Sequence, residues 1–206
     1  MQIKNKKLIV IFYILNLFFF SFSAIADEFN ISSKEIIVDK ENNTIIGKGS
    51  VEVRDDSGKI IYADKIKYEK SKEFLLSEGN VEINDEVGNI ITTNKATYDK
   101  PNETIVTYDD VEIILKDGYK ISSKNVMYNT IDKFLQSNEI TTFIDIDGNI
   151  VKTSMFQYDI KKNLFTSIGE IKITDIKKNK YFFKEIYVDT KKKEMIGSDV
   201  SVVLDK

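Results

Sequence analysis

The chain has 206 residues, of which 42% are hydrophobic and 31% charged, and its formal net charge is −3. It contains no Cys and no His. Their absence excludes thiolate nucleophiles, zinc–thiolate and imidazole metal sites, and the Ser-His-Asp and Cys-His arrangements. What remains is carboxylate, Lys, Tyr or Ser chemistry, or no chemistry. The length is that of one domain, or at most two.

The N-terminus has the pattern of an export signal. Lys4, Lys6 and Lys7 precede an apolar run over residues 8–22, and Ala24 and Ala26 are the small residues of a cleavage site. This order predicts a signal peptide at residues 1–26 and an exported domain at residues 27–206. A retained anchor helix is the alternative, because the run up to Ala26 approaches the ~20 residues that cross a bilayer.

Removal of residues 1–26 takes away three lysines and no acidic residue. The exported domain then has 27 basic and 33 acidic residues and a net charge of −6. A duplex nucleic acid would need a basic stripe, so we expect no nucleic-acid partner.

A period of 30 residues runs through the exported domain. A tyrosine recurs every 30 residues, and the same spacing continued in both directions reaches Val38 and Val188. The tyrosines are Tyr68, Tyr98, Tyr128 and Tyr158. Residues 27–206 hold six such periods without a gap, which is typical of a repeat architecture. Apolar residues fill the positions of Ile31, Ile36 and Val53 in all or nearly all periods.

Within each period the pattern is that of strands that bend. Val51 and Val53 alternate with Glu52 and Arg54, as on a half-buried strand. The apolar residues change from odd to even numbers at the same place in every period, which predicts a bulge or corner there. Polar clusters such as residues 100–103 predict short turns. Short connections favour antiparallel pairing, so we expect an all-β, folded-over antiparallel sheet of six repeats, without helix.

Other candidate sites have structural interpretations. Residues 145–148 resemble half a calcium loop without its remaining ligands, and we interpret them as a turn. Asp39 and its equivalents in the later periods form an acidic column, which we expect to point outward into solvent. We therefore predict no catalytic residue, no metal site and no cofactor.

Two features of such a stack allow more than one interpretation. Its two ends either add strands to another chain or are distorted and self-capping. Its inner face is either a packed core, the more frequent outcome, or an apolar groove for acyl chains.

Several segments resemble a known family. Residues 79–83 (GNVEI), 88–91 (GNII) and 97–99 (TYD), together with residues 61–68 (IYADKIKY), resemble the OstA-like domains of lipopolysaccharide transport. The resemblance spans residues 30–206. It implies a β-jellyroll whose apolar interior carries lipid A acyl chains through the periplasm. It also implies edge-to-edge pairing with other jellyrolls of that system.

The resemblance leaves open whether the chain is a self-standing LptA-like bridge or the N-terminal domain of an LptD-like outer-membrane protein. In the second case the outer membrane is a further partner. The predicted groove lining is Ile36, Ile66, Tyr68, Leu75, Ile83, Tyr98, Ile105, Ile113, Val126, Tyr128, Leu135, Phe143, Phe156, Tyr158 and Phe165. The predicted pairing edges are Ile31, Ile36 and Val38 at one end and Val200, Val202 and Leu204 at the other.

Two rival functions differ in class from a lipid carrier. A purely structural stack, such as an adhesin or fibre segment, predicts a filled interior without lipid. A polysaccharide-acting enzyme predicts two carboxylates converging in a cleft, whereas the acidic column is expected to point outward. We therefore expect a non-enzymatic protein.

Overall fold

A computed structural model of the chain describes residues 29–205, and the predicted signal peptide lies outside the described residues. The part described is almost entirely β-structure, as predicted, and its strands are the following. They are β1 (Phe29–Ser32), β2 (Glu35–Asp39), β3 (Thr44–Asp55), β4 (Ile60–Glu69), β5 (Phe74–Asn84), β6 (Ile90–Asp99), β7 (Thr104–Ile114), β8 (Lys120–Lys124), β9 (Met127–Asn129), β10 (Phe134–Ser137), β11 (Thr141–Ile144), β12 (Ile150–Thr153), β13 (Phe156–Asp159), β14 (Leu164–Thr174), β15 (Lys180–Asp189), β16 (Glu194–Ser198) and β17 (Ser201–Val203). The helical content described is one 3-10 turn, η1 (Lys70–Lys72), within the turn between β4 and β5.

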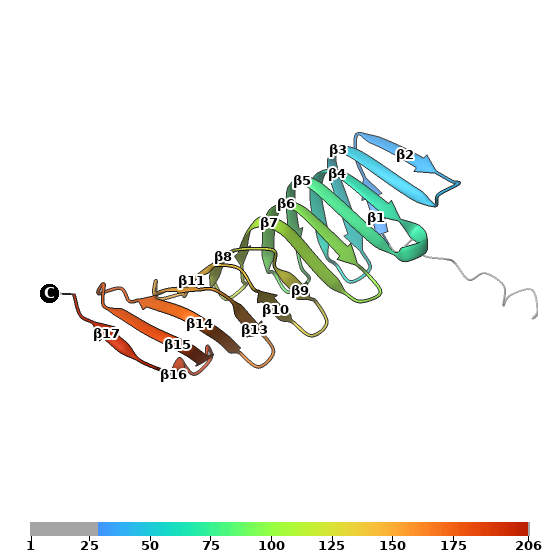
Figure 1. Cartoon of the computed structure of the whole chain (residues 1–206). Helices are drawn as coiled ribbons and strands as arrows, with labels where there is room; N and C mark the ends of the chain where they lie inside the picture. The colour runs from blue at the N-terminus through green and yellow to red at the C-terminus, as the bar shows by residue number, and fades with distance from the viewer. Residues whose placement is uncertain (1–28, 206) are drawn as a thin grey trace, which may run out of the picture.

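The strands form one continuous antiparallel sheet. From β3 to β7 each strand pairs with the next along the chain. The order continues through β8–β13 to β14 and β15. Each 30-residue period therefore supplies one outgoing and one returning strand. The stack turns gradually about its long axis from one end to the other (Figure 1), as the right-handed twist of strands requires.

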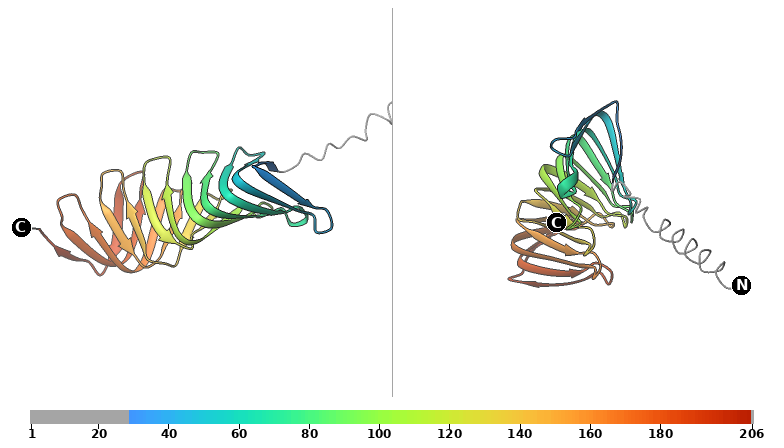
Figure 2. Two further views of the ribbon diagram at one scale, coloured as in Figure 1. Left: turned by 90° about the horizontal axis from the view of Figure 1, so that it is seen from above. Right: turned by 90° about the vertical axis from the view of Figure 1, so that its right-hand side faces the viewer.

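Every long strand bends at a corner near its middle, where the sequence predicted one. The pairing register shifts between Lys48 and Val51, and the shift recurs one strand later between Tyr62 and Lys65. It recurs in the β5–β6, β6–β7 and β14–β15 pairs. Each bulge adds one residue and reverses the faces of the side chains beyond it. The folded sheet thus has two arms joined along a line of bulges, as the bent strands of Figure 2 show.

In the middle of the stack the corner interrupts the strands altogether. The outgoing and returning strands are split there into β8 and β9, β10 and β11, and β12 and β13. The two pieces of each strand keep their places in the two arms, because β9 and β10 continue one arm while β8 and β11 continue the other.

Turns form two rows along the free margins of the arms. The first turn row contains residues 40–43, 70–73 and the later equivalents, and the second contains residues 56–58, 86–88 and theirs. The acidic column lies beside the first row, half-buried rather than in open solvent. Asp39 accepts a hydrogen bond from the backbone N–H of Asn42, and Asp159 does so from Lys162. The column therefore points away from the buried tyrosines beside it, as expected, and also closes turns. Its partial burial corrects only the expectation of full exposure to solvent.

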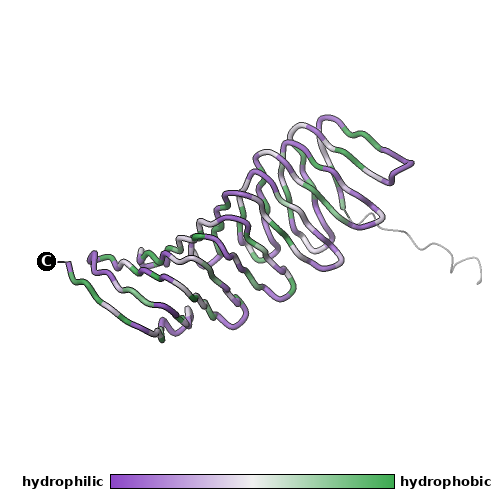
Figure 3. The backbone as a smooth tube through the Cα atoms, viewed as in Figure 1, coloured by the Kyte–Doolittle hydropathy of each residue, from purple (hydrophilic) through white to green (hydrophobic). Residues whose placement is uncertain are grey.

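The core lies between the two arms. Hydrophobic and polar residues alternate along the strands (Figure 3), and one set points inward on both arms. Leu75, Ile105, Ile121 and Phe156 have no measurable exposure to solvent. The core extends as one cluster from Phe29 to Ile186, so each period is stabilised by burial against its neighbours.

Candidate functional site

The predicted groove-lining residues lie inside the folded sheet. Fourteen of the fifteen are at most 5% exposed, and the exception is Ile36, which is 48% exposed. Ile36 lies on β2 at the N-terminal end of the described stack, where no further strand covers it. Over most of its length the interior is therefore a filled core in this structure. Whether lipid contacts these residues stays a prediction.

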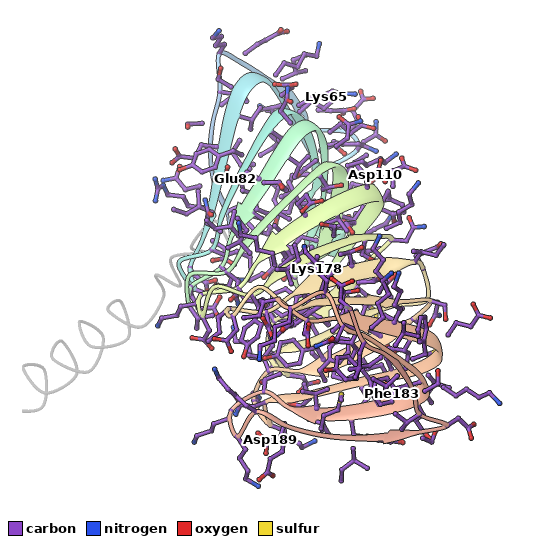
Figure 4. The ribbon with its side chains drawn as sticks, turned by 90° about the vertical axis from the view of Figure 1, so that its left-hand side faces the viewer. Lys65, Glu82, Asp110, Lys178, Phe183 and Asp189 are labelled. Carbon is purple, nitrogen blue, oxygen red and sulfur yellow. The ribbon has the colours of Figure 1, made fainter. Side chains whose placement is uncertain are left out.

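Aromatic rings fill the C-terminal half of the interior. Phe143 lies 5.1 Å from Phe165 and 5.3 Å from Tyr119, measured between ring centroids. Phe156 stacks on Phe165 with 6.0 Å between the centroids. Figure 4 looks onto the C-terminal end and shows side chains occupying the space between the arms. Such ring pairs add to the stabilisation that burial alone gives.

The two turn rows meet along a seam that closes the interior on its open side. Lys100, in the first turn row, pairs with Asp56 in the second. Lys133 pairs with Glu86 in the same way one period later. Near the C-terminal end Lys193 contacts Asp147, with 2.7 Å between Nζ and Oδ2. We call this line of contacts the seam.

A buried ionic cluster holds the N-terminal part of the seam. The side chains of Lys59 and Asp55 are each 1% exposed, and Lys59 Nζ lies 3.0 Å from Asp55 Oδ2. The Lys59 ammonium also contacts Glu103 Oε2 at 3.3 Å and the Tyr98 hydroxyl at 2.8 Å. Tyr98 donates to Glu103 at 2.7 Å. Each charge in the cluster has a partner of opposite sign, which offsets the cost of its burial.

The cluster shifts the acidity of its members. Burial acts to raise the pKa of Asp55, but hydrogen bonds from Ser57 and Lys59 outweigh it and lower that pKa. Burial likewise acts to raise the pKa of Glu103, but hydrogen bonds from donors such as Tyr98 outweigh burial and lower that pKa. Burial and the neighbouring Glu103 raise the pKa of Tyr98 far above its ordinary value. The cluster is therefore ionised at its carboxylates, protonated at its phenol, and suited to holding the arms together.

One period later a smaller version of the cluster recurs. The Tyr128 hydroxyl donates to Asp85 at 2.8 Å, and Asp85 also accepts from the Asn89 side chain at 2.7 Å. Lys133 lies 4.0 Å from the same carboxylate. Burial and Asp85 together raise the pKa of Tyr128. The seam therefore places aspartates at regular positions along the margin of the apolar interior.

The filled interior gives way to a cavity of about 250 Å³ near its C-terminal end. Its apolar wall includes Phe143, Phe165, Val188 and Met195. Asp145 also lines the cavity, together with both members of the Lys193–Asp147 ion pair. The cavity lies where the tyrosine column has ended, because Val188 stands at the next 30-residue step after Tyr158.

Both ends of the described stack present strands that pair on one side. At the N-terminal end β1 and β2 both pair with β3, and within residues 29–205 they have no second partner. The predicted edge residues Ile36 and Val38 are 48% and 57% exposed, whereas Ile31 is half-buried.

At the C-terminal end β16 and β17 both pair with β15 alone among the described strands. The three predicted edge residues are strongly exposed, at 55% for Val200, 49% for Val202 and 68% for Leu204. In β17 the register lacks the shift seen in other periods, so Val202 rather than Val203 lies opposite Tyr181. Residues directly opposite one another in an antiparallel pair share a face of the sheet, so Val202 lies on the face of Tyr181.

The seam is the structural feature that could not be predicted from the sequence. A signal for it exists, because Asp55, Asp85, Asp145 and Asp175 are spaced at multiples of 30 residues. The residue four places later is Lys59 in the first of these turns and Asn in the other three. Nothing in a single period shows that the turns of one arm lie against those of the other.

Among residues 29–205 no group of three or more carboxylates is placed to hold a metal ion. No helix in that range has the length and apolar character needed to span a membrane.

Comparison with known proteins gives weak structural likenesses. No protein-family model matches the chain, and no curated protein matches its sequence. One similar solved structure is LptH of Pseudomonas aeruginosa, described as the LptA homologous periplasmic component of the lipopolysaccharide transport device. It has 11% identity and a TM-score of 0.27, covering 87% of this chain and 99% of that one. The TCP10 domain of Danio rerio CPAP has 15% identity and a TM-score of 0.19, covering 84% of this chain and 99% of that one.

Proposed function

We propose that this chain is a non-enzymatic periplasmic carrier in lipopolysaccharide transport and outer-membrane assembly. The lipid A acyl chains would occupy the space between the arms, and the two ends would pair edge to edge with other jellyrolls of the transport system. The observation that carries the proposal is the combination of a continuous apolar interior with exposed apolar strands at both ends of the described stack. The resemblance of residues 30–206 to OstA-like domains supports it.

Because the interior is filled with side chains, lipid can enter it only if the two arms move apart. Residues such as Ile66, Val126 and Phe156 are at most 1% exposed, so lipid reaches them only when the two arms separate. The seam is where the arms part most readily, because its contacts are ion pairs and hydrogen bonds and not strand pairing. Under the proposal, lipid entry therefore opens the seam.

The proposal is tested by photo-crosslinking to lipopolysaccharide. A small diazirine amino acid is placed at Ile66, Val126 or Phe156, and at Lys67 as the outward control. We expect lipopolysaccharide adducts at the three interior positions and none at Lys67, whose side chain is 45% exposed on the outer face. Adducts at Lys67 with none inside would contradict the proposal.

A second experiment tests the route of entry. Lys100→Cys and Asp56→Cys, joined by a short bifunctional maleimide, lock the seam. The matched control joins Lys65→Cys to Lys95→Cys, since both lysines contact Glu78 on the outside of one arm. We expect the seam lock to abolish interior adducts and the control link to leave them unchanged.

A purely structural repeat is the second candidate function, and the filled interior favours it. A stack that only spans a distance needs a dry core and no opening of the seam. This candidate predicts no lipopolysaccharide adduct at any position, with or without the lock. The same crosslinking series therefore separates the two functions.

A further inference from the structure

The cavity near the C-terminal end occupies a position that a tyrosine fills elsewhere in the stack. In two earlier periods a tyrosine hydroxyl lies within hydrogen-bond distance of the aspartate 43 residues before it. Tyr98 lies 3.3 Å from Asp55, and Tyr128 lies 2.8 Å from Asp85, measured between hydroxyl and Oδ2. In both cases the ring lies in the core and the hydroxyl reaches the seam.

The same separation of 43 residues joins Val188 to Asp145. Both residues line the cavity, so the repeat geometry places them as it places Tyr128 and Asp85. Val188 has neither the ring nor the hydroxyl. The cavity of about 250 Å³ therefore lies where the missing ring would be.

The carboxylate of Asp145 keeps its turn contacts but lacks the donor that its equivalents receive. It accepts from the backbone N–H groups of Asp147 and Asn149 and from the Asn149 side chain at 2.7 Å. In the described part of the chain it receives no hydrogen bond from a hydroxyl or an ammonium group, because Lys193 contacts Asp147 instead. Its equivalents Asp55 and Asp85 each have a tyrosine hydroxyl within hydrogen-bond distance.

We propose that this cavity binds a phenol. The flat ring would pack among Phe143, Phe165, Val188 and Met195, and the hydroxyl would donate to Asp145. Hydrogen bonds that involve an ionised partner are about twice as strong as neutral ones. The ligand would thus supply both parts of the tyrosine that the sixth period lacks.

The size and the opening of the cavity fit a ligand of this class. An apolar cavity of about 150 Å³ is enough to bind benzene in another protein, and this one is larger. Ile146, at the wall of the cavity, is 52% exposed, and the Lys193–Asp147 pair beside it is solvent-accessible. The ligand therefore has a route from solvent. The proposal is independent of the lipid-carrier function.

Isothermal titration of the full chain with phenol and with anisole tests the proposal. Anisole keeps the ring but has no donor, so we expect it to bind at least about tenfold more weakly. Equal binding of the two would overturn the role of Asp145. Decanoate is a third ligand, and binding of decanoate without phenol would show an acyl-chain site and overturn the proposal.

Two variants provide the matched pair. Val188→Tyr restores the ring and the hydroxyl, so we expect loss of phenol binding and a rise in Tm of about 2–4 °C. Ile168→Tyr adds the same side chain at a position that is 54% exposed and does not line the cavity, so phenol binding stays unchanged. Retained phenol binding by Val188→Tyr would place the ligand elsewhere and overturn the proposal.

A variant at Tyr128 should create an equivalent site at an earlier period of the stack. Tyr128→Val removes the ring beside Asp85, and we expect phenol to raise the Tm of this variant more than that of the unchanged chain. An unchanged phenol response would contradict the equivalence between the two positions. If Tyr128→Val fails to fold without ligand, refolding in the presence of phenol but not of anisole gives the same answer.

Discussion

The ammonium of Lys59 is the most thoroughly buried cation of the seam contacts described above. Lys59→Met removes it and leaves Asp55, whose side chain is 1% exposed, with only the more distant Lys100 ammonium at 3.7 Å. Breaking a buried pair from one side costs about 3–5 kcal/mol, and we expect the free energy of unfolding to fall by that amount in urea titrations. Lys65→Met is the matched control, because its pair with Glu78 is exposed and contributes about 1 kcal/mol or less. A loss as small as the control's would mean that the cluster does not hold the seam.

The carboxylates of the same cluster make stability depend on pH in the acid range. The pKa values of Asp55, Asp56 and Glu103 are lowered in the folded chain, with hydrogen bonds from Lys59, Lys100 and Tyr98 among the causes. A lowered pKa means a contribution that is fully present above the unfolded value and is lost as pH falls through the folded value. We therefore expect the free energy of unfolding to decline as pH drops below about 4.

The variant Asp56→Asn isolates one part of that decline. It removes a titrating group, so its stability should fall less steeply between pH 4 and pH 2 than that of the unchanged chain. Urea titrations at each pH measure the difference. Parallel curves for the two proteins would show that Asp56 is not linked to folding.

At the scale of the strand, the bulge depends on a residue that fits a tight corner. Gly79 lies at the β5 bulge with φ of +76°, and a Cβ there would come within 2.5 Å of the Asp64 carboxylate on the neighbouring strand. Gly79→Ala thus combines left-handed strain with a steric clash. We expect a loss of about 2–3 kcal/mol in chemical denaturation. Glu78→Ala, one residue earlier on the exposed face, should change stability by about 0.5 kcal/mol or less.

The strands and their corners could be predicted from the sequence because each depends on neighbours a few residues apart. Alternation over Val51 and Val53 predicts a strand, and the reversal of parity predicts the bulge that the register confirms. The seam could not be predicted in the same way. Tyr98 meets Asp55 across 43 residues, and that contact depends on how sharply the two arms fold together. The exposed ends were also predicted, but the one-residue change of register in β17 arises from a bulge that the last period lacks.

At the scale of the whole molecule, stability is distributed unevenly along the stack. A repeat stack is held by contacts between adjacent periods, so an end strand is stabilised from one side only. β16 and β17 have no buried residue, whereas β4, β5 and β6 each have at least four. The N-terminal part of the seam has the buried ionic cluster, and the C-terminal part has the cavity. Unfolding should therefore begin at β17 and proceed toward the N-terminal half.

Native-state hydrogen exchange in low urea measures this order. We expect amides of β16 and β17 to exchange through local openings that cost little free energy, while those of β4–β6 exchange only through openings close to global unfolding, about 5–15 kcal/mol. Lys59→Met should lower the protection of β4–β6 and leave that of β16 and β17 unchanged, because the latter open without disturbing the cluster. Uniform protection along the chain would instead show one cooperative unit. In that case the arms could not part locally, and lipid entry through the seam would require unfolding of the whole stack.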